Sequence, residues 1–162
     1  MQNVIMHELA HQWFGNLITM VWWDDLWLNE AFATFMACLC QYAYKDVKDE
    51  AWLDLINEKQ WGVAEDQKKS THPIATLAID SVEAEQMFDG ISYGKGSAFL
   101  KQVYKYLSPE VFKEGVRLYF AKYANGNTTL KNFVNCLEIA KGEKGVNEWV
   151  ESWLTTQGVM LI

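Results

Sequence analysis

Residues 7–17 read His-Glu-Leu-Ala-His-Gln-Trp-Phe-Gly-Asn-Leu and contain the pattern H-E-x-x-H inside an apolar segment. The spacing of apolar residues predicts a helix over 4–14 that ends at Gly15. Residues four apart in a helix lie on the same side, so His7 and His11 can both reach one ion, with Glu8 beside it. This arrangement is typical of a zinc site with an open position for water, whose proton Glu8 can accept.

A third protein ligand is expected from a neighbouring helix. Glu30 follows His11 at the start of the next apolar helix, and we interpret it as that ligand. An acid at a helix N-terminus also has a purely structural interpretation, because it complements the helix dipole. Residues 1–44 contain no Lys or Arg, a local charge balance that favours a divalent cation and a substrate ammonium group. Two further acids in this stretch, Asp24 and Asp25, are interpreted as capping and loop residues.

The pattern of apolar residues predicts a mainly α-helical chain. Apolar positions recur about every three or four residues over most segments, and only two prolines interrupt them. We expect one compact domain, or one part of a larger domain. Further helices are predicted over 28–44, 51–69, 93–107, 109–123, 129–140 and 146–156, with an extended run over 17–23, a loop with short elements over 70–92 and a turn at 125–127.

Composition excludes several classes of protein. The 162 residues include 21 Asp or Glu and 14 Lys or Arg, which gives a net charge of −7. Arg117 is the only arginine, so no basic stripe exists to neutralise phosphates, and nucleic acid is not an expected partner. The longest uncharged apolar stretch, 31–44, is shorter than the roughly 20 residues that span a bilayer, so no membrane contact is expected. Three cysteines, interpreted as reduced thiols, and a start without signal-peptide features suggest a cytoplasmic location.

Several stretches together resemble one family. They are residues 7–17, Trp22-Trp23, Leu26-Trp27-Leu28-Asn29-Glu30, Thr71-His72-Pro73-Ile74, residues 88–96 (Phe-Asp-Gly-Ile-Ser-Tyr-Gly-Lys-Gly) and the ending 153–159. Over nearly the whole chain these sequence stretches resemble the zinc aminopeptidase family that contains aminopeptidase N and puromycin-sensitive aminopeptidase. The resemblance implies a gluzincin site, in which His7, His11 and Glu30 hold one Zn²⁺ per chain.

The resemblance also implies roles for two side chains that do not hold the metal. Glu8 would be the general base and later the proton donor to the leaving amine. The Tyr93 hydroxyl would stabilise the oxyanion of the tetrahedral intermediate, a role that suits a preorganised donor. From its own surroundings in the sequence, Tyr93 is an aromatic residue at a helix start.

The implied fold is a thermolysin-like metallopeptidase catalytic domain, mainly α, of which residues 1–162 are the helical part without its β-rich N-terminal portion. Within this partial domain we expect zinc-site helices over 1–45 and a helical remainder over 46–162. Family members place a strand that grips the free amine of the substrate before the zinc helix, and only six residues precede His7 here. The missing parts of the parent chain are therefore expected partners, and exposed apolar surface would favour self-association.

The leading expectation is a zinc-dependent aminopeptidase that removes N-terminal residues from peptide substrates. Two other enzymes share the motif, a thermolysin-like endopeptidase and the leukotriene epoxide hydrolase relative. From a different class, the chain could be a catalytically incomplete zinc-binding helical fragment or a peptide-binding scaffold. The intact Glu8 argues against that alternative, because a structural zinc site needs no base. His72 is interpreted as structural, and Trp22, Trp23 and Trp27 as core residues.

Overall fold

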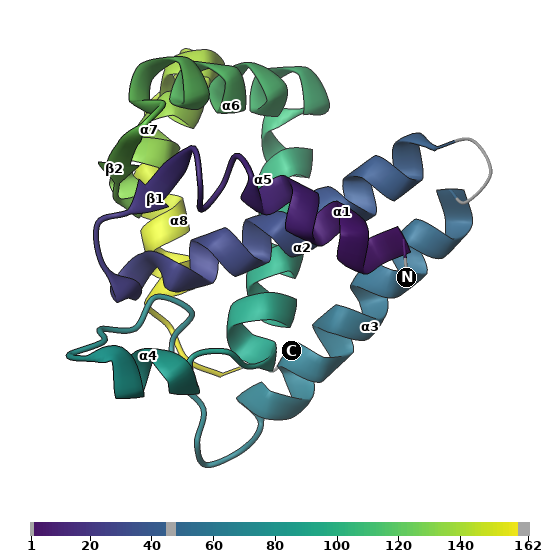
Figure 1. Cartoon of the computed structure of the whole chain (residues 1–162), viewed down its shortest axis with the longest axis vertical. Coiled ribbons are helices and arrows are strands. Elements are labelled where there is room, and N and C mark those ends of the chain that lie inside the picture. The colour runs from purple at the N-terminus through teal and green to yellow at the C-terminus, as the bar shows by residue number, and fades with distance from the viewer. Residues whose placement is uncertain (1, 45–47, 159–162) are drawn as a thin grey trace.

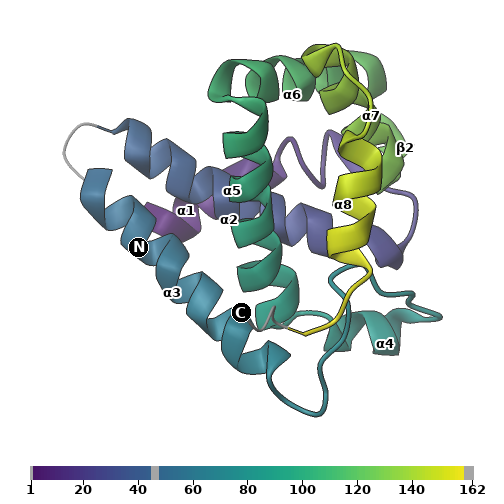
Figure 2. The same cartoon turned by 180° about the vertical axis from the view of Figure 1, so that it is seen from behind.

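The computed structural model describes residues 2–44 and 48–158 and is built mainly of helices (Figures 1 and 2). This confirms the predicted mainly α class. The described elements, in chain order, are α1 (Gln2–His11), β1 (Ile18–Met20), a 3₁₀ turn η1 (Trp23–Asp25), α2 (Leu26–Ala43), α3 (Lys48–Asp66), α4 (Ser81–Gln86), a π-helical turn η2 (Ile91–Lys95), α5 (Gly96–Leu107), α6 (Pro109–Tyr123), β2 (Gly126–Thr128), α7 (Leu130–Lys141) and α8 (Val146–Leu154).

Helix α2 is the centre of the packing. It lies between α1 on one side and α5 on the other, and α3 also packs against it (Figures 1 and 2). Its side chains are apolar on nearly all faces, and Leu28, Phe32 and Phe35 are buried. A helix that is apolar all round is stable only when other elements surround it.

An aromatic cluster joins the end of α1 to the C-terminal helices. Phe14 is fully buried, and its ring stacks on that of Phe32 with 3.9 Å between centroids. The rings of Tyr119 on α6 and Phe133 on α7 lie 5.2 and 5.4 Å from Phe14. Aromatic pairs at these distances contribute about 0.5–1.5 kcal/mol each beyond their buried area. The turn that follows the H-E-x-x-H helix is therefore anchored in the main core.

The two short strands form a parallel pair that the sequence pattern did not predict. Ile18 lies opposite Gly126, and Met20 lies opposite Thr128. The predicted extended run over 17–23 is wrong at its end, because only Ile18–Met20 form a strand and Trp23 begins η1. The predicted turn at 125–127 overlaps β2, since three residues are too few to display an alternating pattern.

Local capping explains where several helices begin. The Ser108 hydroxyl accepts a hydrogen bond from the Val111 N–H at 3.4 Å, and Pro109 is the first residue of α6, as predicted. Asp25 accepts from the Leu130 N–H at the start of α7, and Asp24 accepts from the Ala78 N–H. Both contacts agree with the interpretation of these acids as capping and loop residues.

Some expectations need correction at the level of single residues. Trp27 is buried, but Trp22 and Trp23 are exposed, so the core interpretation was wrong for those two. Helix α8 ends at Leu154 rather than at 156. Cys38, Cys40 and Cys136 are free thiols, and Cys40 is exposed. Over the described residues, no helix combines the length and apolarity needed to span a membrane.

Candidate metal centre and active site

Helix α1 places two imidazoles side by side. His7 and His11 are one helical turn apart, and their Nε2 atoms lie 3.0 Å from each other. The two rings meet edge to face, with 4.7 Å between centroids. Both side chains are largely buried, at 16% and 19% exposed. The predicted helix thus presents both histidines from one face.

Helix α2 brings Glu30 to the same point, because α1 packs against α2. One carboxylate oxygen, Oε2, lies 3.3 Å from His7 Nε2 and 3.4 Å from His11 Nε2. One possible ligand atom from each of the three residues lies within 4.8 Å of the others. Two nitrogens and a carboxylate oxygen at this spacing fit the donor set of a catalytic zinc ion. Across 2–44 and 48–158, no other trio of His, Cys, Asp or Glu converges in this way.

The electrostatics of the trio keep Glu30 ionised. Burial raises the pKa of Glu30, but hydrogen bonds from His11, His7 and Tyr93 outweigh this effect and bring the pKa to about 2. The hydrogen bond to Glu30 in turn raises the pKa of His11 above its ordinary value, against the opposing effect of burial. An ionised carboxylate beside two imidazoles is a set that attracts a divalent cation.

The far nitrogens of both imidazoles have partners of their own. His11 Nδ1 lies 3.0 Å from the carbonyl oxygen of Phe14, to which it can only donate. His7 Nδ1 lies 3.3 Å from the Thr34 hydroxyl on α2. Such contacts orient the rings, so that both Nε2 atoms face Glu30, the direction from which a metal would be bound. Sequence reasoning missed both partners, although the spacing of Thr34, four residues after Glu30, could have indicated that the two share a face.

Tyr93 reaches the site from the π-helical turn η2. Its ring lies nearly parallel to that of His7, with 6.1 Å between centroids, and its hydroxyl interacts with the Glu30 carboxylate. Burial, followed by the charges of Glu30 and Glu8, raises the pKa of Tyr93 above its usual value. The hydroxyl therefore stays protonated near neutral pH and can donate a hydrogen bond.

Two further carboxylates face this site. Glu8 is exposed, and its negative charge acts on both His11 and Tyr93. Glu58 of α3 is half-buried, and burial raises its pKa while the nearby His7 lowers it. Sequence reasoning missed Glu58, because nothing in its local pattern indicates that α3 turns this residue toward α1.

A sequence profile of the peptidase family M1 domain matches residues 1–153. This chain belongs to peptidase family M1. The M1 chain is 43% identical over 160 residues to Aminopeptidase N of Streptomyces lividans. The matched region covers 98% of this chain and 19% of that protein. It is 42% identical over 158 residues to Tricorn protease-interacting factor F2 of Thermoplasma volcanium, a match that covers 95% of this chain and 20% of that protein. It is also 38% identical over 166 residues to Leucyl aminopeptidase of Saccharolobus solfataricus, a match that covers 99% of this chain and 20% of that protein.

The M1 chain spans about a fifth of the length of the curated relatives it matches. The expected family resemblance is thereby confirmed.

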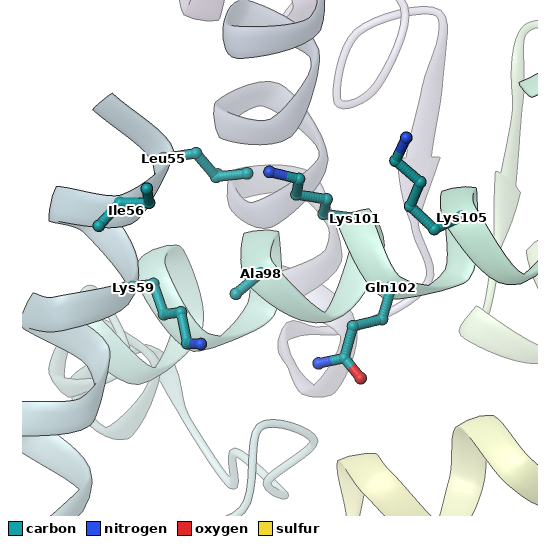
Figure 3. Close-up of a pocket in the computed structure, with 7 residues that line it drawn as sticks. All are labelled: Leu55, Ile56, Lys59, Ala98, Lys101, Gln102 and Lys105. Carbon is teal, nitrogen blue, oxygen red and sulfur yellow. The ribbon is translucent and has the colours of Figure 1, made fainter. Parts of the chain in front are cut away.

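The third histidine of the M1 chain stands apart from the candidate ligand trio. His72 is held by Asp89, with 2.9 Å between Nε2 and Oδ2, and not by the His7–His11–Glu30 trio. A hollow between α3 and α5 is also separate, because none of its lining residues belongs to that trio. Figure 3 shows this hollow, lined by Leu55, Ile56, Lys59, Ala98, Lys101, Gln102 and Lys105.

Proposed function

We propose that this M1 chain carries the zinc site of an aminopeptidase that removes N-terminal residues from peptides. The observation that carries the proposal is the convergence of His7 Nε2, His11 Nε2 and Glu30 Oε2. These three residues would hold one Zn²⁺ per chain. When bound, zinc would supply a Lewis acid and lower the pKa of a water molecule toward neutrality.

Glu8 is the proposed general base. It lies one residue after His7 on the same helix, and its charge already acts on His11 and Tyr93. An exposed carboxylate at this position can accept a proton from the attacking water and return it to the amine that leaves. Both transfers need the carboxylate within hydrogen-bond reach of the water and of the scissile nitrogen.

Tyr93 is the proposed donor to the oxygen that gains negative charge during attack. Its raised pKa keeps the proton on the hydroxyl, and its ring contact with His7 and its interaction with Glu30 support a position of that hydroxyl near the proposed ligand atoms. A donor that is already in place costs no reorganisation when the charge develops. Removal of one such donor typically lowers kcat about 100- to 1000-fold.

The charge of the site supports a substrate with a free amine. Residues 1–44 contain no Lys or Arg, and Glu58 adds a half-buried carboxylate from α3. A site with this excess of negative charge attracts an ammonium group. It supports the aminopeptidase reading over an endopeptidase, whose substrates carry no charge at the cleaved bond.

Zinc content and hydrolysis of an amino-acid arylamide, measured together, test the proposal. We expect one zinc per chain and cleavage of the arylamide with a free amine but not of its N-acetylated form. Both should be measured on residues 1–162 and on the longer protein, if the chain is part of one. Equal cleavage of the two substrates would identify an endopeptidase. Zinc without cleavage in either protein would favour the alternative, a catalytically incomplete zinc-binding fragment or a peptide-binding scaffold.

Further proposals concern the surroundings of the site. The division into zinc-site helices over 1–45 and a remainder over 46–162 stays a prediction, and its boundary lies outside the described residues. Val4, Ile5 and Leu9 expose more than half of their surface on α1. This apolar face supports a contact with the rest of the parent chain or, in isolation, self-association. Sedimentation of residues 1–162 over a range of concentrations tests the latter. A cytoplasmic location, suggested by the free thiols, also stays a prediction.

A further inference from the structure

An ion pair lies beside the turn that carries Tyr93. His72 is in the loop between α3 and α4 (Figure 1), and its Nε2 is 2.9 Å from Asp89 Oδ2. His72 Nδ1 lies 2.7 Å from the carbonyl oxygen of Pro73. A carbonyl and an ionised carboxylate both only accept hydrogen bonds, so both ring nitrogens of His72 must carry a proton. The pair is therefore an imidazolium with a carboxylate, about a quarter exposed on each side.

Asp89 uses its remaining groups to hold the backbone of η2. Its second oxygen, Oδ1, accepts hydrogen bonds from the N–H groups of Ile91 and Ser92, both at 3.0 Å. Its backbone carbonyl accepts a hydrogen bond from the Tyr93 N–H, also at 3.0 Å. Asp89 therefore contacts three successive N–H groups at the start of the turn, the last of which belongs to Tyr93.

The C-terminal part of the turn is also fixed by contacts with α3. Gly94 lies against the backbone of Glu58, and Lys95 makes an ion pair with Asp66 at 2.8 Å. The position of the Tyr93 hydroxyl thus depends on contacts at both ends of a five-residue turn. At its N-terminal end the N–H groups of Ile91, Ser92 and Tyr93 all donate to Asp89, and His72 contacts the carboxylate of that residue.

We propose that His72 and Asp89 are positioning residues for Tyr93, and that together they set the place of its hydroxyl beside Glu30. The inference rests on the proposed role of Tyr93 as a hydrogen-bond donor in peptide hydrolysis. The competing interpretation is that the pair only stabilises the loop over 67–80. The two differ in what happens to Tyr93 when the pair is broken and the protein remains folded.

Two mild substitutions break the pair, and a third is a matched control. Asp89→Asn keeps a side-chain oxygen that can cap the turn, since Asn caps as well as Asp, but removes the negative charge opposite His72. His72→Gln keeps a neutral donor and removes the positive charge. Asp80 caps α4 through the N–H groups of Val82 and Glu83 at 2.9 Å, yet α4 carries none of the proposed site residues. Asp80→Asn therefore repeats the change without reaching Tyr93.

The kinetic test uses the zinc-loaded protein with the free-amine arylamide. We expect Asp89→Asn and His72→Gln to lower kcat between about 10- and 100-fold, the size typical of a small misplacement of a catalytic group. KM and zinc content should stay within about twofold of the parent values, and Asp80→Asn should change nothing. In a Tyr93→Phe background neither substitution should lower kcat further, because the hydroxyl that they position is gone. If either substitution lowered kcat by the same factor in the Tyr93→Phe background as in the parent protein, the proposal would be overturned.

A second measurement does not depend on activity. In protein labelled with ¹³C at the tyrosine ζ-carbon, the Tyr93 signal is the one that disappears in Tyr93→Phe. We expect it to shift in Asp89→Asn and His72→Gln and to stay in place in Asp80→Asn. An unmoved signal would overturn the positioning role whatever the kinetics. A moved signal in a protein whose kcat is insensitive to Tyr93→Phe would instead support positioning and reject the proposed role of Tyr93.

Discussion

The backbone of Gly94 lies so close to that of Glu58 that a Cβ at position 94 would overlap the Glu58 carbonyl oxygen. Gly62 on the same helix also approaches this turn closely, since a Cβ there would lie 2.7 Å from the Gly90 carbonyl oxygen. Helix α3 and the turn η2 therefore meet backbone to backbone, without side chains between them. This contact brings both Tyr93 and Glu58 to the histidines of α1.

Gly94→Ala is expected to displace the turn and destabilise the protein. Overpacking of a tight contact typically costs about 1–3 kcal/mol, and here the obstacle is backbone, which cannot rotate away. Urea unfolding measures this cost, and the Tyr93 ¹³C signal should move with it. Gly142→Ala is the control: its positive φ of 73° costs about 1 kcal/mol, but nothing lies within 4 Å, so Tyr93 should not respond. An unchanged Tyr93 signal in Gly94→Ala would contradict the backbone contact.

Glu8→Gln is expected to keep zinc and lose hydrolysis. The amide cannot accept the proton of the attacking water, and loss of a general base lowers kcat about 100- to 10,000-fold. Zinc content should be unchanged, because Glu8 is not among the three convergent ligands. Glu110→Gln on α6 is the control, because it makes the same Glu-to-Gln change at an exposed position outside the proposed site. Its zinc content and activity should equal those of the parent protein. Activity that survives in Glu8→Gln would mean that another group is the base.

Glu30→Gln is expected to release the metal. The amide removes the anionic ligand at almost the same shape, so zinc affinity should fall by more than the roughly 10- to 100-fold that follows loss of an outer partner. Competition with a chromogenic chelator measures this affinity. Treatment of the parent protein with a strong chelator should likewise abolish hydrolysis, and added zinc should restore it. Parent-like zinc affinity in Glu30→Gln would remove this residue from the ligand set.

Lys95→Met is expected to destabilise the protein by about 3–5 kcal/mol. Lys95 Nζ lies 2.8 Å from Asp66 Oδ2, and the Asp66 side chain is fully buried, so the change leaves a buried charge without its partner. Adding Asp66→Asn should recover part of the loss, because the unpaired charge is then removed. Lys68→Met breaks an exposed pair with Glu65 and should cost less than about 1 kcal/mol. Similar costs for the two lysine variants, measured by urea unfolding, would contradict the burial of Asp66.

The His72–Asp89 pair is expected to make stability depend on pH. The hydrogen bond to Asp89 raises the pKa of His72, so its contribution is complete below 6.5 and is lost as pH rises through the raised value. Burial raises the pKa of Asp89, but the hydrogen bonds from His72 and Ser92 outweigh this, so its contribution is complete above 3.8 and is lost only at lower pH. The pair should therefore contribute most between 3.8 and 6.5, by about 1 kcal/mol.

The measurement is the difference in unfolding free energy between the parent and His72→Gln across this range. The proposed zinc ligands are the same in both proteins, so the difference isolates the pair. Nearby Asp66 also raises the pKa of His72 and should be kept unchanged. A difference that is constant with pH would show that His72 is neutral in the folded protein.

Much of the site could be predicted from the sequence because it depends on local geometry. His7, Glu8 and His11 share one helix, and the four-residue spacing alone determines that both imidazoles lie on one side. The apolar pattern likewise placed the next helix, at whose first turns Glu30 lies beside the two imidazoles. Helix starts such as Pro109 after Ser108 followed from capping chemistry within three or four residues.

Tertiary structure alone decided the rest, because those contacts join residues whose sequence separation leaves no local trace. The pairing of Ile18 with Gly126, the pair of His72 with Asp89 and the approach of Glu58 to His7 arise only when helices pack. Tyr93 became a candidate by family resemblance, and its place beside Glu30 depends on a π-helical turn pressed against α3. Sequence by itself thus determined the helices and the donor types of the site. Packing, which sets distances between side chains from different elements, decided which groups surround them.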